Sequence, residues 1–309
     1  MTAAVPPVAT PAGPEPDADH EAGRSLWHDA FGRLRRNPVA ILGFVIVAVF
    51  VLVALLAPLL APYDGSALPG RGQVTPTSLP GPSAEFRLGV DRFGGDVLSK
   101  LIFGARASLV IGVVSTVIGL LGGMLLGVLA GAFGGWVDTV VMRLVDILLS
   151  VPNLLLAVSI AAVLGQSSTA VMIAIGAAQV PIFARLLRGS MLAQRQAEYV
   201  TAARTLGLSR WAVALRHVLP NSVGPLIVQA TLTLATAVID AAALSFLGLG
   251  GGAPQTAEWG RMLTYAQNEL AIAPRLAFLP GICIAVTALG FTLLGESLRE
   301  ALNPGARRR

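Results

Sequence analysis

Lysine, cysteine and histidine are scarce in this 309-residue sequence. Cys283 is the only cysteine, so no intrachain disulfide can form, and the three histidines are scattered, without the Cys/His spacing of a metal site. Lys100 is the only lysine, and its context, DVLSKL, lacks the preceding glycines of a P-loop. The sequence therefore predicts that this chain does not itself hydrolyse ATP, and that it binds neither a metal nor a cofactor of its own.

Charge is also scarce, at 13% of residues against about 25% in a typical soluble domain. Hydrophobic residues make up 54% of the chain. The net charge of +5 could suggest a nucleic-acid partner, but the arginines lie at the ends of apolar runs and form no separate basic domain. This pattern favours a membrane protein whose basic residues set its topology, with the lipid bilayer as a partner and no nucleic acid.

The N-terminal part of the chain divides into a tail, an apolar run and a loop. Residues 1–23, rich in Pro, Ala, Asp and Glu, are expected to be disordered, and with the basic stretch to residue 38 they form a tail. Residues 39–61 are long enough to cross a bilayer. A cleaved signal peptide is the alternative, but the run exceeds the usual length of its apolar region. Residues 62–104 are expected to form an extracytoplasmic loop with a short amphipathic helix at about 95–103.

Five further apolar runs lie in a core predicted to cover residues 105–300, and a basic tail, 301–309, follows them. The fold class expected is an all-α membrane protein with six transmembrane helices. The five later spans are expected at about residues 107–131, 144–164, 168–188, 219–248 and 276–298.

Arginines gather before the first span, between the fourth and fifth, and after the sixth. With six spans these regions share one side of the membrane, and the positive-inside rule makes that side cytoplasmic. The loop after the first span also carries basic residues, which weakens the asymmetry, but acidic residues accompany them. We expect a multi-pass protein of the cell membrane with both termini in the cytoplasm.

A stripe of glycines occupies one face of the second span. Gly119, Gly123, Gly127 and Gly131 are each four residues apart, which lets another helix backbone approach closely. The stripe can serve packing within one subunit or an interface between subunits, and the sequence leaves both open.

A polar stretch, EYVTAARTLGLSRWAVALRHVLPN, interrupts the apolar runs between the fourth and fifth spans. It predicts a short helix from Glu198, whose carboxylate favours the helix dipole, to Leu206, with Gly207 as a left-handed stop. Ser209 can cap a second helix, which Pro220 interrupts. On the first helix the small or apolar residues Tyr199, Ala202, Ala203 and Leu206 share one side. Such a helix can dock into a groove of another protein or lie on the lipid surface.

This stretch resembles the cytoplasmic loop of ABC importer permeases, which reads Glu-Ala-Ala, three residues, Gly, nine residues, Ile, any residue, Leu-Pro. Thr201-Ala202-Ala203, Gly207 and Leu219-Pro220 stand at the matching distances, while Thr201 replaces the usual Glu and His217 the usual Ile. The segments LGVDRFGGDVLSKLIFGARASL, FGGWVDTVVMRLVDILLSVPNLLLA, ALSFLGLG, WGRMLTYA and LLGESLREALNP also resemble the dipeptide/oligopeptide-type group, in its second-permease form.

The resemblance implies the type I importer permease fold, with a coupling helix between spans four and five. It implies that this chain forms half of a path for di- or oligopeptides; nickel–chelate and glutathione permeases have similar sequences and remain alternatives. The implied partners are a second permease, two ATPase subunits that hold ATP and Mg, and an extracytoplasmic substrate-binding protein. The implied coupling residues are Glu198, Tyr199, Thr201, Ala202, Ala203, Arg204, Leu206, Gly207, Leu219 and Pro220.

Acidic residues in or beside the spans raise two rival classes. An intramembrane hydrolase is disfavoured because neither HExxH nor GxSxG occurs. A duplicated half would favour a channel or an ATP-independent secondary transporter, and the sequence does not show one. We expect Asp146 to be a helix-end residue or to pair with Arg143, and Glu296 to lie near Arg299. Asp240 either lines a translocation path or pairs across helices.

Overall fold

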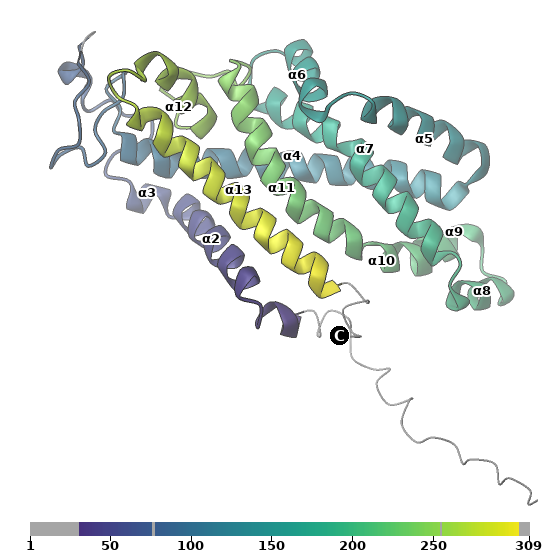
Figure 1. Ribbon diagram of the computed structural model, residues 1–309. Coiled ribbons are helices and arrows are strands. Elements are labelled where there is room, and N and C mark those ends of the chain that lie inside the picture. Colours follow the sequence, from purple (N-terminus) through teal and green to yellow (C-terminus); the bar gives the residue numbers. More distant parts are fainter. Residues whose placement is uncertain (1–30, 76–77, 254, 303–309) are drawn as a thin grey trace, which may run out of the picture.

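The computed structural model describes residues 31–75, 78–253 and 255–302. The predicted disorder of residues 1–23 and the tail from residue 303 lie outside these ranges. Within them the chain is helical, and β-structure is limited to two isolated bridges in the loop after the first span. Long helices pack side by side in a bundle, with shorter helices at its two ends (Figure 1).

Five single helices of the described residues are long and apolar enough to cross a membrane. A sixth crossing is available if α5 and α6, which are bent by 93° at their junction, count together as one span. The helices are α2 (Pro38–Leu55), α4 (Val97–Phe133), α5 (Gly135–Leu149), α6 (Asn153–Leu164), α7 (Ser168–Gln194), α11 (Gly224–Phe246) and α13 (Arg275–Leu302).

The shorter helices lie before, between and beside these spans. The start of α2, helix α8 and the end of α13 lie towards one end of the bundle, in the lower part of Figure 1, while α3 and α12 lie towards the other. The shorter elements are α3 (Ala57–Leu60), η1 (Arg71–Gln73), α8 (Glu198–Thr205), α9 (Arg210–Val213), η2 (Ala214–Val218), α10 (Leu219–Ser222), α12 (Trp259–Ala266) and η3 (Gln267–Glu269).

The boundaries of two predicted segments differ from the structure. The short amphipathic helix expected at about 95–103 is not separate, because α4 begins at Val97, capped by the Asp96 side chain, and continues unbroken to Phe133. The span expected at 144–164 is not one continuous helix, because it begins earlier, at Gly135, and the chain bends between Leu149 and Asn153. Pro152 lies at this bend and has no N–H with which to continue the helix.

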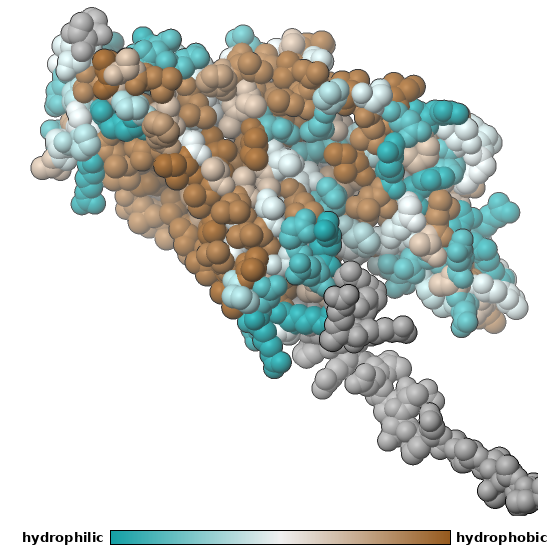
Figure 2. Space-filling view, viewed as in Figure 1, coloured by the Kyte–Doolittle hydropathy of each residue, from teal (hydrophilic) through white to brown (hydrophobic). Residues whose placement is uncertain are grey.

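Most of α2 faces outward and carries large apolar side chains. Ala40, Gly43 and Ala54 are its buried residues, whereas nine of its Val, Ile, Leu and Phe side chains are exposed. Figure 2 shows this apolar surface continuing over α13 as a brown band, with polar residues towards the two ends of the bundle. A continuous exposed apolar surface of this kind suits contact with lipid acyl chains.

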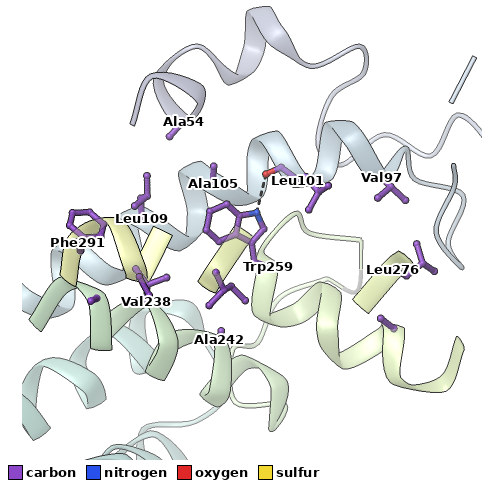
Figure 3. Packing of buried hydrophobic residues seen from close by; sticks show 14 of the residues in the cluster. Ala54, Val97, Leu101, Ala105, Leu109, Val238, Ala242, Trp259, Leu276 and Phe291 are labelled. Atoms are coloured by element: carbon purple, nitrogen blue, oxygen red, sulfur yellow. Dashed lines mark hydrogen bonds between the residues drawn. The ribbon is translucent and has the colours of Figure 1, made fainter. Parts of the chain in front are cut away.

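A hydrophobic core joins α2, α4, α11, α12 and α13 near the end of the bundle that carries α12. Trp259 is fully buried at its centre and donates a hydrogen bond from Nε1 to the Leu101 carbonyl oxygen at 3.0 Å (Figure 3). The Phe50 ring of α2 packs edge-on against the Trp259 ring, with the ring centroids 5.6 Å apart. A buried indole with a satisfied N–H fixes α12 to the start of α4.

Candidate functional site

Helix α8 forms where the sequence predicts it, and its stop is the predicted glycine. Gly207 has φ +82°, the left-handed conformation that glycine adopts without strain. Its N–H donates to the Arg204 carbonyl oxygen at 2.9 Å, and the next N–H, of Leu208, donates to Ala203 at 3.3 Å. Ser209 then caps α9 by accepting from the Ala212 N–H at 3.2 Å. The chain therefore turns sharply between two short helices, as expected.

One face of α8 is anchored in the chain's own core. Val200 and Ala203 are buried in a cluster with Leu187 and Met191 of α7 and Val213 of α9. Ala203 is 6% exposed. The prediction that it shares a docking face with Ala202 is therefore wrong, because its methyl group faces the bundle.

The opposite side of α8 is open. Tyr199, Ala202 and Leu206 are exposed, and the Leu206 side chain is 83% exposed although it is apolar. Glu198, Thr201 and Arg204, the other predicted coupling residues of this helix, are also exposed, and Arg204 in addition lines a pocket on the side towards α7. Helix α8 is therefore attached to the bundle through Val200 and Ala203, and its exposed surface carries both apolar and polar side chains.

The Leu-Pro pair begins a short helix that leads from the loop into α11. Leu219 and Pro220 start α10 directly after the π-helical turn η2. The Ser222 hydroxyl donates to the Val218 carbonyl oxygen at 2.8 Å, and the Ser222 carbonyl accepts from the Ser190 hydroxyl of α7 at 3.2 Å. The first bond lies within the turn from η2 into α10, and the second ties this turn, which leads into α11, to the end of α7.

The glycine stripe of α4 packs against α7 within this chain. Gly119, Gly123, Gly127 and Gly131 are all buried, and a Cβ on each would meet atoms of α7 within 3.0 Å. At Gly127, for example, the Leu187 Cβ would be 2.8 Å away. Of the two interpretations left open by the sequence, the structure supports packing inside one subunit.

Three polar pairs connect α5 and α6 to α7 and α11. Arg188 holds both carboxylate oxygens of Asp138, at 2.6 and 2.7 Å. Asp146 pairs with Arg185, so the predicted pairing of Asp146 with Arg143 is not the one formed. The pairs lie on helices that span the membrane, where an ionisable group is costly unless it faces another protein or water.

Asp240 is the third of these polar groups. The Asn153 side chain, at the start of α6, donates to its Oδ2 at 3.2 Å. The contact joins α11 to the bend between α5 and α6. Of the two roles left open for Asp240, pairing across helices is observed. Glu296 and Arg299 form the expected pair, at 3.1 Å.

A groove lies between α5, α7 and α11 beside these pairs. Its volume is about 600 Å³, and Arg185 lines it together with Gln229 of α11. The remaining lining residues are Leu149, Ile182, Leu186, Gly189, Ser190 and Pro225. No local sequence signal indicated this groove or the Asp138–Arg188 pair, because both bring together residues that are far apart in the chain.

The segment between α11 and α13 contains a buried charged pair. Glu258 caps α12 by accepting from the Gly260 N–H at 3.2 Å, and Arg261 lies 3.8 Å away. Arg261 also donates to the carbonyl oxygens of Ala253 and Gly250. Burial raises the pKa of Glu258, and Arg261 lowers it by less. Among the residues described, no group of three His, Cys, Asp or Glu side chains could hold a metal ion.

The fold and these sites define a multi-pass helical membrane protein with a helical loop at one end. Residues 123–308 match the family described as binding-protein-dependent transport system inner membrane component. Residues 25–74 match the N-terminal TM domain of oligopeptide transport permease C. The chain belongs to the first of these families and is a permease subunit of an ABC importer, a translocation subunit without catalytic activity.

Two curated relatives match along nearly the whole chain. The dipeptide transport system permease protein DppC of Alkalihalophilus pseudofirmus is 40% identical over 95% of this chain and 94% of its own length. The glutathione transport system permease protein GsiD of Escherichia coli is 41% identical over 91% of each chain.

Solved structures share the fold at low sequence identity. An inward-facing MetNI methionine ABC transporter chain matches with a TM-score of 0.54 and 19% identity, over 66% of this chain and 96% of that one. A chain of an amino acid ABC transporter crystallised with histidines matches with a TM-score of 0.52 and 16% identity, over 64% of this chain and 92% of that one. These likenesses support the type I importer permease fold.

Proposed function

We propose that this chain forms half of a path for di- or oligopeptides, paired with a second permease and driven by two separate ATPase subunits. An extracytoplasmic binding protein delivers the substrate. The similarity to a dipeptide permease over nearly the whole chain supports the peptide substrate. The absence of a P-loop in the sequence supports a separate source of energy, since ATP and Mg would then sit on the partners.

The coupling element in this proposal is α8 with the turn that follows it. The observation that carries it is the two-sided arrangement of the helix. Val200 and Ala203 fix it to the bundle, whereas Ala202 and the apolar Leu206 are left outside. An exposed leucine on a short polar helix suits a cleft in a protein partner. Leu219, Pro220 and the hydrogen bonds around Ser222 would pass motion of α8 to α11.

The path in this proposal runs along the face formed by α5, α7 and α11. Its charged pairs and groove would be costly against lipid, so this face suits a water-filled path and the second permease. The outer faces of α2 and α13, which are apolar and exposed, would contact the bilayer instead. Asp240 would then lie beside the path and hold the bent pair through Asn153.

A substitution on the outer face of α8 tests the coupling proposal. Ala202→Glu puts a carboxylate into the proposed contact and leaves the anchor residues untouched. We expect loss of ATPase co-purification and of substrate-stimulated ATP hydrolysis. Ala203→Glu is the poorer test, since it places the charge in the chain's own core.

Ala271→Glu is the matched control, because Ala271 is exposed in the turn between η3 and α13. Helix α12, which precedes this turn, lies at the opposite end of the bundle from α8 (Figure 1). The control should leave ATPase co-purification at the wild-type level. Full ATPase retention and full stimulated hydrolysis in Ala202→Glu would remove α8 as the docking element and favour the lipid-surface interpretation.

The orientation is part of the proposal and has its own test. Both termini and α8 would be cytoplasmic, because arginines gather at that end. Single cysteines at positions 75 and 205, placed in a Cys283→Ala chain, should react with impermeant reagent from outside and inside, respectively. Reaction at position 205 from outside intact cells would contradict the orientation.

Glutathione is the second candidate substrate, because the GsiD relatives match this chain as well as the dipeptide permease does. Uptake of labelled dipeptide and labelled glutathione by the assembled importer separates the two. Uptake of glutathione alone would overturn the peptide assignment and leave the coupling proposal intact. Uptake that persists without ATP would instead favour a secondary transporter or channel.

A further inference from the structure

A basic pocket lies where α4 and α7 end and the loop helices begin. Its volume is about 350 Å³. Arg195 at the end of α7, Arg204 of α8 and Arg210 of α9 line it. The rest of its lining is small or apolar and consists of Gly131, Ala132, Met191, Leu208, Val213, Ala214 and Val218. A cavity lined by three arginines and an apolar wall is suited to an anion that carries an apolar body.

The charge of this pocket is not balanced within the described part of the chain. Arg195 donates to the Gly131 carbonyl oxygen at 2.8 Å, an uncharged partner. The guanidinium groups of Arg204 and Arg210 form no ion pair or hydrogen bond with any described residue. Glu198, the acidic residue of the same helix as Arg204, pairs with neither. The pocket therefore presents positive charge to whatever enters it.

Aromatic side chains show where this pocket lies relative to the bilayer. Phe133, at the end of α4, packs edge-on against Trp211 of α9 at 4.8 Å, and both rings remain partly exposed. Trp136, at the start of α5, is 77% exposed. Exposed tryptophans at the ends of spanning helices mark the headgroup level of a membrane. Phe133 and Trp211 adjoin Ala132 and Arg210, so the pocket lies at the same level.

We propose that Arg195, Arg204 and Arg210 bind the phosphate of an anionic phospholipid from the leaflet at this end of the bundle. The planar guanidinium forks match phosphate oxygens, and the apolar wall of Met191, Val213 and Val218 receives the glycerol and first methylenes. A carboxylate from a protein partner is less well suited, because the pocket opens beside the ends of two spanning helices and is rimmed by aromatic rings. This site is independent of the proposed peptide path.

Lipid binding to the full chain, purified with its co-purifying subunits, tests the site. Native mass spectrometry follows the titration of phosphatidylglycerol against phosphatidylcholine with the same acyl chains. We expect the wild type to bind phosphatidylglycerol more tightly. Arg210→Gln should weaken that binding about fivefold, because one basic residue at the membrane surface contributes about 1 kcal/mol to the attraction of anionic lipid. Arg195→Gln with Arg210→Gln should weaken it about thirtyfold.

Arg216→Gln is the matched control, since Arg216 is exposed in the same loop and does not line the pocket. It should bind phosphatidylglycerol like the wild type. Equal binding of the two lipids, or wild-type binding by Arg210→Gln, would overturn the proposal. Displacement of the lipid by millimolar inorganic phosphate would assign the pocket to a free anion instead. Unchanged lipid binding with loss of the ATPase from Arg210→Gln would assign it to an acidic side chain of that partner.

Discussion

Replacing Gly123 with alanine should separate α4 from α7. The added Cβ would lie 2.8 Å from the Val180 carbonyl oxygen and 2.9 Å from the Ala184 backbone nitrogen, with the Phe183 Cβ closer still. Two of these atoms belong to backbone and the third is the first atom of a buried side chain, so none can rotate away. The helices must move apart, and contacts along the whole stripe weaken.

The size of the effect follows from two opposing terms. Overpacking a buried site typically costs about 1–3 kcal/mol. Replacing a helical glycine by alanine returns about 0.5–1 kcal/mol through backbone entropy and hydration. We expect Gly123→Ala to lower the free energy of unfolding by about 1–2 kcal/mol, because overpacking outweighs the gain from replacing glycine. At Gly127 the nearest atoms are the Leu187 Cβ at 2.8 Å and the Ala184 carbonyl oxygen at 3.0 Å, so the loss should be smaller.

Gly189→Ala is the matched control, because Gly189 lies in α7 and a Cβ there would meet nothing within 4 Å. It should keep the entropic gain and stabilise the chain by about 0.5–1 kcal/mol. Reversible unfolding of the purified chain in mixed detergent and dodecyl sulfate micelles measures all three variants. If Gly123→Ala proves as stable as Gly189→Ala, the close approach of the two helices does not hold the bundle together.

Three further predictions use the same unfolding measurement. Gly207→Val should cost about 1–2 kcal/mol because its φ of +82° is strained for a β-branched residue, and Gly207→Asn should cost less; equal losses would show that this conformation is not the cause. Burial raises the pKa of Glu258, so the folded chain holds its proton more tightly than the unfolded chain. The contribution of Glu258 to the stability of the fold is therefore greatest below the ordinary pKa of a glutamate. It is lost as the pH rises through the pKa of Glu258 in the folded chain. Glu258→Gln should make the stability fall less as the pH rises. If the stability of the wild type and of Glu258→Gln falls equally with pH, Glu258 is not the group responsible. Asp138→Asn should cost about 1.5–3 kcal/mol, because it weakens two charge-assisted hydrogen bonds to Arg188. Asp146→Asn should cost under about 1 kcal/mol, since the Asp146–Arg185 pair is more than half exposed, and the reverse order would refute this comparison.

The sequence predicted the helical membrane fold, the location of α8 and its stop at Gly207. These features depend on composition and on preferences that act within a few residues. A run of apolar residues can satisfy its backbone in lipid only as a helix, and glycine readily adopts the left-handed conformation that ends one. The motif spacing around Thr201 and Leu219-Pro220 also indicated the family, because it is a property of the sequence alone. The glycine stripe predicted a close helix contact, although it could not name the partner.

The tertiary structure decided which surfaces meet. It assigned the glycine stripe to α7 and turned Ala203 towards Met191, although helical spacing alone placed it beside Ala202. It also gave Asp146 the partner Arg185 instead of Arg143, a choice that local sequence could not make.

Helix boundaries changed for the same reason. Hydropathy alone predicted an apolar span at residues 144–164 but not its bend at Pro152, where Asn153 donates a hydrogen bond to Asp240 of α11. Helical periodicity specifies which residues share a face but not which neighbour covers that face. The neighbour is selected by long-range packing, where close backbone approach and the pairing of buried charges outweigh local preference.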